Sequence, residues 1–136
     1  MMELPIEDQF NLMDLGVDAV ILFGSHATGA DDKNSDLDFG ILLNEQGLRQ
    51  RHENYHAYYT AVYDVLASRF GDLKGLDVVF LDRAPLELRR HVALYGQVLM
   101  EKYPGQVADF NTQSVLLYAD FEPYRVMMNQ AVLAHI

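Results

Sequence analysis

The chain has 136 residues, enough for one domain with a hydrophobic core and too few for a catalytic domain plus a separate substrate-binding domain. A formal net charge of −10 disfavours DNA or RNA polymers as partners, because nucleic-acid binding depends on Lys and Arg neutralising phosphates. No apolar run is long enough to span a membrane, the acidic start does not resemble a secretory signal, and there is no cysteine for a disulfide or a thiolate metal site. We therefore expect one cytoplasmic domain, residues 1–136, that acts on proteins or small molecules.

The first half of the chain predicts a helix, two strands and a long helix. The first fifteen residues have helical apolar spacing that Gly16 can stop, and Val17 to Phe23 follows as a buried strand. Gly24 to Ser35 is a polar loop, and a second strand spans about Leu37 to Leu43. A long helix is expected from about Gln46 to Phe70, because apolar residues recur at three- and four-residue steps at Tyr55, Tyr59, Val62 and Leu66.

The second half predicts two more strands and two helical regions. A strand from Leu76 to Leu81 precedes a helix from Leu86 to Tyr95 that Gly96 closes, and Gln97 to Glu101 is a short fourth strand. A C-terminal helical segment begins at about residue 104. Its apolar stripe runs through Val107, Phe110, Ser114, Leu117, Phe121, Tyr124, Met128 and Ala131.

That C-terminal stripe must face something. It packs either on its own domain or on a second chain, as a homo- or hetero-oligomer. Pro123 would break a helix interior, but Asp120 can cap a new segment and leave Pro123 in its tolerated first turn. We therefore expect a kink, or two separate helical pieces.

Two aspartates at the start of the second predicted strand indicate a metal site. Asp36 and Asp38 are two residues apart, so a strand points both carboxylates to one face. Two such charges about 4 Å apart repel by roughly 4 kcal/mol at an effective dielectric near 20, and a bound cation relieves that repulsion. Oxygen-only ligands suit Mg²⁺, which takes the rest of its shell from waters and substrate phosphates.

A phosphate-binding turn precedes these aspartates by ten residues. Gly24 lets the backbone approach a phosphate closely, and Ser25 adds a hydroxyl donor and opens a turn whose free amides can face an anion. A third carboxylate is needed to bridge two metals and to deprotonate an attacking hydroxyl, and Asp77 is on a strand that could lie beside the first pair. Asp82 is the rival, although strand parity puts it on the opposite face.

Other motifs in the chain are incomplete. The run His-Glu-Asn-Tyr-His at residues 52–56 matches the H-E-x-x-H zinc pattern, but the preceding helical residues are mostly polar and no third histidine follows at the expected spacing. Residues 32–38 alternate as in a calcium loop, but Leu37 and Leu43 occupy the places of its glycine and its glutamate. His26 could touch a phosphate or be an ordinary loop residue, and the chain has no G-x-S-x-G or P-loop motif.

Taken together, Gly24-Ser25, then Asp36-x-Asp38, then Asp77 resemble the active-site pattern of the DNA polymerase beta-like nucleotidyltransferase superfamily. Within that superfamily, the chain resembles the minimal nucleotidyltransferase (MNT) group, whose members are often antitoxins paired with HEPN-domain toxins. The resemblance lies in the size, in the run Tyr-Gly-Gln-Val-Leu at residues 95–99 and in the tail near Asp120. That group often has an arginine where this chain has Thr28, so the phosphate or partner contact of that arginine is not expected here.

The resemblance implies an α/β fold with a small mixed sheet of about four strands and helices mainly on one side. It implies that Gly24 and Ser25 hold ATP, and that Asp36, Asp38 and Asp77 bind two Mg²⁺ ions and activate a hydroxyl. The implied reaction transfers AMP to a tyrosine of a HEPN ribonuclease toxin and silences it. A nucleotide-binding antitoxin that neutralises its partner by contact alone is the alternative. Transfer to a small metabolite or antibiotic is disfavoured, because little chain is left for a second pocket wall.

Overall fold

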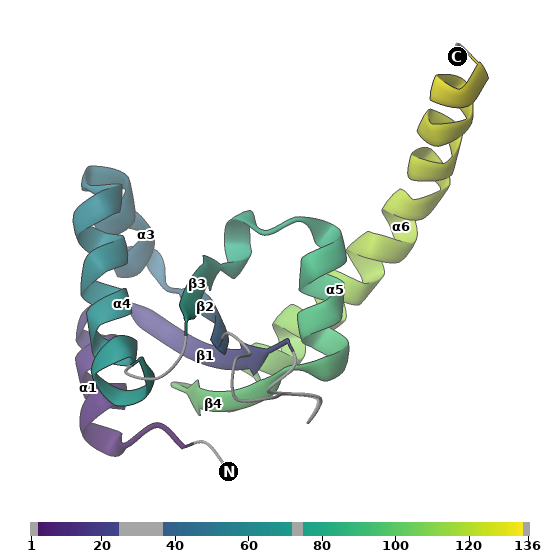
Figure 1. Cartoon of the computed structure of the whole chain (residues 1–136). Helices are drawn as coiled ribbons and strands as arrows, with labels where there is room; N and C mark the ends of the chain where they lie inside the picture. The colour runs from purple at the N-terminus through teal and green to yellow at the C-terminus, as the bar shows by residue number, and fades with distance from the viewer. Residues whose placement is uncertain (1–2, 25–36, 72–74, 135–136) are drawn as a thin grey trace.

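The fold consists of a four-stranded sheet with helices on both sides, and the computed structural model describes residues 3–24, 37–71 and 75–134 (Figure 1). The strands match the predicted ones closely, although Leu81 belongs to the short 3-10 helix η1 rather than to β3. In chain order the elements are α1 (Ile6–Asp14), β1 (Val17–Phe23), β2 (Leu37–Leu43), α3 (Glu45–Glu53), α4 (Tyr55–Phe70), β3 (Leu76–Phe80), η1 (Leu81–Arg83), α5 (Leu86–Tyr95), β4 (Gln97–Glu101) and α6 (Gln106–Ala134).

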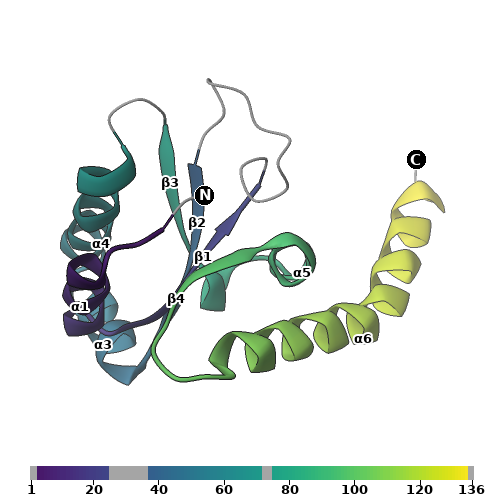
Figure 2. The same cartoon turned by 90° about the horizontal axis from the view of Figure 1, so that it is seen from below.

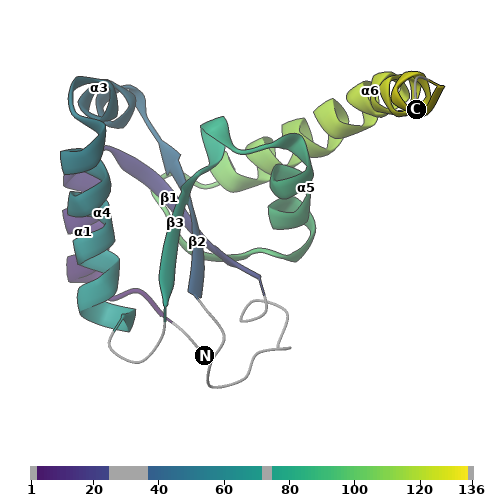
Figure 3. The same ribbon diagram turned by 45° about the horizontal axis from the view of Figure 1, so that its top comes forward.

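The sheet is mixed, as expected, with strand order β3-β2-β1-β4. β1 is antiparallel to both β2 and β4, whereas β2 and β3 are parallel. The parallel pair requires a crossover, which α3 and α4 supply. As a result, the C-terminal end of β1 and the N-terminal ends of β2 and β3 meet at one end of the sheet, which we call the site end (Figure 3).

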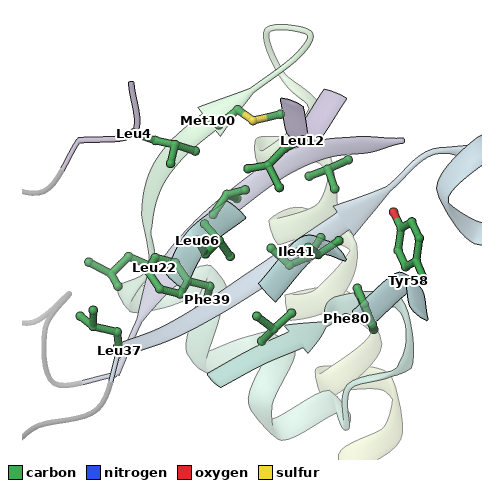
Figure 4. Close-up of a cluster of buried hydrophobic side chains, with 14 residues drawn as sticks. Leu4, Leu12, Leu22, Leu37, Phe39, Ile41, Tyr58, Leu66, Phe80 and Met100 are labelled. Carbon is green, nitrogen blue, oxygen red and sulfur yellow. The ribbon is translucent and has the colours of Figure 1, made fainter. Parts of the chain in front are cut away.

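The larger core lies between one face of the sheet and helices α1 and α4. Alternate residues of β2 point into it, and Leu37, Phe39 and Ile41 are each no more than 1% exposed. Phe39 stacks on Phe70 at the end of α4, with ring centroids 5.4 Å apart. Figure 4 shows this cluster, in which Leu12, Leu66 and other apolar side chains converge from the helices onto the strands.

A smaller core covers part of the opposite face, under α5 and the first turns of α6 (Figure 2). Ile21 and Phe23 of β1 contribute to it with Val92 of α5 and Val107 of α6. Gly96 marks the close approach of α5 to the sheet, since a Cβ there would lie 2.6 Å from Ile21 Cγ2. Helices therefore pack on both faces, with α1, α3 and α4 on one side and α5 and α6 on the other.

The prediction of one long helix from Gln46 to Phe70 is wrong. The helix is interrupted at Asn54, which separates α3 from α4. Asn54 has an extended backbone (φ −154°, ψ 95°), and its side chain accepts a hydrogen bond from the Ala57 amide at 3.1 Å. An asparagine that caps a new helix in this way offers the backbone an alternative to continuing the old one. Tyr55, expected on the buried stripe, is instead 51% exposed.

The C-terminal stripe packs on its own domain only over its first part. Val107 and Ser114 are buried, whereas the apolar residues from Leu116 onward are exposed, except for the half-buried Tyr118. α6 is one continuous helix that includes Pro123, so the prediction of two separate pieces is wrong. The helix bends along its length, as the other alternative predicted (Figure 2). Within the described residues, no helix combines the length and apolarity that crossing a bilayer requires.

An ion pair between a buried arginine and an exposed aspartate joins α3 to the segment after β3. Arg51 is 4% exposed, and its Nη1 and Nη2 donate to Asp82 Oδ1 and Oδ2 at 2.8 and 2.7 Å. Its guanidinium also lies 5.2 Å from the centre of the Phe80 ring. The hydrogen bonds from Arg51 lower the pKa of the Asp82 carboxyl, although partial burial of Asp82 opposes that shift. The pair thus connects the crossover helix α3 to the C-terminal end of β3, which is the end away from the site end.

We expect Asp82→Asn to lower the free energy of unfolding near neutral pH by about 1–2 kcal/mol, because the buried Arg51 charge loses its counterion, while solvent at the exposed Asp82 screens part of the interaction. Since the folded-state pKa of Asp82 is depressed, its contribution is present above the ordinary value of 3.8 and is lost as the pH falls below that value. Urea unfolding of wild type and variant should therefore differ at neutral pH and converge in acid. Asp64→Asn, on the exposed side of α4, is the matched control. Equal stabilities near pH 7 would contradict the assignment.

Candidate active site

Two of the predicted carboxylates lie side by side at the site end. Asp38 is the second residue of β2 and Asp77 the second residue of β3, and the two are paired in the parallel register. Paired residues of neighbouring strands lie about 5 Å apart and share one face. That face is opposite to the core that contains Phe39 and Val78, so both carboxylates point away from the larger core. Asp77 is exposed and Asp38 is partly buried.

Gly24, the residue after β1, lies directly against the Asp38 carboxylate. It follows Phe23, which pairs with Asp38, and its backbone has φ +82°, a conformation that glycine adopts without strain. A Cβ at position 24 would lie 2.5 Å from Asp38 Oδ2. Any larger residue would therefore displace the carboxylate. The structure thus brings together three of the five predicted site residues, each from a different strand end.

Ser25 and Asp36, the other two predicted site residues, lie outside the described residues, as do His26 and Thr28. Within residues 3–24, 37–71 and 75–134, no three His, Asp or Glu side chains are grouped closely enough to hold a metal ion. Carboxylate oxygens, such as those of Asp38 and Asp77, are of the ligand type that Mg²⁺ prefers. The remaining predicted carboxylate, Asp36, is two residues before Asp38 in sequence.

Tyr59 of α4 is a neighbour of the site that sequence reasoning assigned only to the helix core. Burial raises the pKa of the Tyr59 phenol, and the negative charge of Asp77 adds to the rise, whereas a hydrogen bond with the Val78 backbone opposes it. Its ring packs edge-on against Phe80 with centroids 6.2 Å apart. Tyr59 packs on the larger core, on the face of the sheet opposite to the carboxylates, and only the charge of Asp77 links it to the site. Helical spacing alone cannot predict that Tyr59 lies near Asp77, because that distance depends on where α4 crosses β3.

Two competing sites fail on geometry. Asp82, the rival to Asp77, lies beyond the other end of β3 and pairs with Arg51. The H-E-x-x-H run is divided by the break at Asn54, so His52 ends in α3 and His56 in α4. A zinc motif of this type needs one continuous helix to put both histidines on one face. The calcium-loop alternation falls on residues 32–38, most of which lie outside the described part of the chain.

Residues 9–104 match the family model described as "Polymerase beta, Nucleotidyltransferase". The match covers more than half of the chain, and β1, β2 and β3, which carry the site end, lie within it. The chain therefore belongs to the polymerase beta nucleotidyltransferase family, which confirms the superfamily that the aspartate pattern resembles.

A named relative narrows the resemblance further. The chain is 33% identical over 99 residues to the protein adenylyltransferase MntA of Aphanizomenon flos-aquae (strain 2012/KM1/D3). The match covers 72% of this chain and 65% of the relative, so the chain spans slightly less than two thirds of that protein's length.

Solved structures share the fold at lower identity. A chain from the crystal structure of a toxin–antitoxin with AMP-PNP superposes with a TM-score of 0.64 and 21% identity, covering 92% of this chain and 98% of the other. A chain from the structure of a tri-AMPylated Shewanella oneidensis HEPN toxin in complex with an MNT antitoxin gives a TM-score of 0.60 and 17% identity, covering 94% and 98%. At these identities, the likeness confirms the expected α/β fold.

We expect Asp77→Asn to stabilise the metal-free protein. Asp38 and Asp77 repel each other across the strand pair, and removing one charge should raise the free energy of unfolding by about 1 kcal/mol for a partly solvated pair. Denaturant unfolding in buffer with EDTA measures this directly. A loss of stability instead would mean that the Asp77 carboxylate makes a favourable contact in the folded state.

Proposed function

We propose that this protein is a Mg²⁺-dependent protein adenylyltransferase that acts as an antitoxin, transferring AMP from ATP to a tyrosine hydroxyl of a HEPN-type ribonuclease toxin. The observation that carries the proposal is the pairing of Asp38 with Asp77 on one face, with Gly24 packed against Asp38. Membership of the nucleotidyltransferase family and the similarity to a protein adenylyltransferase support it. ATP as donor makes the cytoplasm the proposed location.

Each site residue has a proposed role. Asp36, Asp38 and Asp77 would hold two Mg²⁺ ions, and Gly24 with Ser25 would hold the triphosphate. The bound metal supplies positive charge that stabilises the attacked phosphate and the leaving pyrophosphate. The missing side chain at Gly24 leaves room for the backbone to approach a phosphate. Asp77 is more exposed than Asp38, so its carboxylate is the one that an incoming hydroxyl can reach.

The proposed reaction is an in-line displacement at the α-phosphorus of ATP. The tyrosine oxygen forms a bond to that phosphorus while the bond to the pyrophosphate oxygen breaks, and the hydroxyl proton moves to the Asp77 carboxylate. A protein acceptor also fits the charge, because 20 acidic residues against 10 basic ones favour an oppositely charged protein surface.

The alternative is a nucleotide-binding antitoxin that neutralises its partner by contact without catalysis. The exposed apolar surface of α6 favours this alternative, since it gives the chain a contact surface away from the carboxylates. The two functions differ in what they require of Asp38 and Asp77. Catalysis needs both carboxylates, whereas stoichiometric contact needs neither.

A transfer assay separates the two. We expect that the chain, incubated with ATP labelled at the α-phosphate, Mg²⁺ and the product of the adjacent gene, labels that product. Asp38→Asn or Asp77→Asn should lower the rate about a thousandfold or more, because each removes a proposed metal ligand. Asp64→Asn, an exposed aspartate on α4, should leave it unchanged. Full neutralisation of the partner by the Asp38→Asn Asp77→Asn variant would instead support the contact mechanism.

Gly24→Ala tests the close approach. It should lower the transfer rate about a hundredfold, because the added Cβ pushes the Asp38 carboxylate aside. Gly105→Ala is the matched control, since Gly105 also has a positive φ (+92°) but nothing lies within 4 Å of an added Cβ. Both variants should lose a similar amount of stability, about 1–2 kcal/mol, from backbone strain. Equal transfer rates for the two variants would rule out the proposed contact between position 24 and Asp38.

A further inference from the structure

The last nine residues of α6 stand away from the rest of the molecule. α6 contacts α5 as far as Arg125, whose Nη1 donates to Glu87 Oε1 at 2.6 Å in an exposed ion pair. Nearer the start of α6, the Arg90 guanidinium of α5 lies 4.9 Å from the ring centre of Tyr118 on α6. Residues 126–134, which we call the free end of α6, are all exposed (Figure 1). The anchor therefore presents the free end as a projecting helix.

Apolar side chains point to every side of the free end. Its sequence, Val-Met-Met-Asn-Gln-Ala-Val-Leu-Ala, contains no charged residue, and its polar residues are Asn129 and Gln130. Successive helix residues are about 100° apart, so Val126, Met127 and Met128 point in three different directions. Their exposed fractions are 47%, 64% and 62%, and Leu133 in the last turn is 70% exposed. A helix that is apolar all round is stable in water only when something surrounds it.

The exposed area matches a protein interface. Nine large apolar side chains between Leu116 and Leu133 are exposed. At about 100 Å² each they present roughly 900 Å², close to the roughly 800 Å² that each partner of a standard complex buries. Five of the nine lie on the free end and supply roughly 500 Å² of that area, and the other four continue the same surface toward Leu116. Because the anchored helix is already formed, little conformational entropy is lost when a partner binds it.

Shape and charge argue that the occupant is a different protein rather than a second copy. A paired copy of α6 would cover one side of each helix and leave the other apolar sides in water. Each copy also carries a net charge of −10, so two copies repel. Asp120 and Glu122, both exposed beside the apolar surface, favour a partner with a basic rim.

We propose that the free end of α6 is a docking helix that inserts into an apolar groove of a basic partner protein, held on at least two sides. This rests on the proposed function, in which the partner is the acceptor of AMP. Figures 1 and 3 show the free end far from the site end of the sheet, where β2 and β3 begin. A partner docked on α6 reaches the carboxylates with another part of its surface, so docking and transfer are separable.

The test uses the double variant Met128→Glu Leu133→Glu, whose changes fall on exposed side chains that take no part in either core. The purified product of the adjacent gene is the probe, and its dissociation constant is measured by titration without nucleotide. We expect the double variant to bind at least about thirtyfold more weakly, as loss of interface anchors does. Ile6→Glu, 59% exposed on α1, is the control and should bind as wild type does. All variants should unfold at the wild-type temperature.

The outcomes separate docking from catalysis. Binding that weakens in the double variant supports the docking helix even if the wild-type chain transfers no AMP, in which case only the proposed function fails. Unchanged affinity and unchanged labelling in the double variant would overturn the docking helix and leave the proposed function standing. A wild-type chain that fails to bind the probe would overturn it too. So would sedimentation showing that the chain alone forms a dimer that the double variant abolishes, since the occupant would then be a second copy.

Discussion

The parallel register between β2 and β3 is the constraint on which the candidate site depends. It sets Asp38 beside Asp77, and both carboxylates point to the face that the larger core leaves free. A shift of one residue in either strand would turn one carboxylate into that core and bring an apolar side chain out. The buried Leu37, Phe39 and Val78 thus hold the register, so the same packing that stabilises the fold also assembles the charged pair.

The crossover between those strands is held by one polar contact between residues far apart in sequence and by one local helix cap. At the end of β3 away from the site, Arg51 of α3 binds Asp82 with both guanidinium amino groups. At the start of the crossover, Asn44 caps α3 through its side chain, accepting from the Gly47 amide. These polar contacts determine where the crossover begins and where it rejoins the strand. They act on the register indirectly, by fixing the position of the segment that follows β3.

The sequence predicted the strands well because each is a short apolar run bounded by glycine or polar residues. β1, β2, α5 and β4 begin and end at the expected residues. The break at Asn54 was missed because apolar spacing continues across it, and the choice between continuing a helix and capping a new one depends on one side-chain hydrogen bond. The Arg51–Asp82 pair joins residues 31 positions apart, which no local pattern encodes. For the site, residue spacing identified Asp38 and Asp77 as candidates, but only strand pairing shows that they are neighbours.

The exposed end of α6 also bears on how the isolated chain behaves in solution. An uncharged apolar helix is a surface through which molecules can stick together without specificity. The excess of ten negative charges keeps the molecules dispersed, and that protection is electrostatic. It weakens when salt screens the charges or when acid protonates the carboxylates. We therefore expect the unpartnered protein to be more soluble in neutral buffers of low ionic strength than in acid or in high salt.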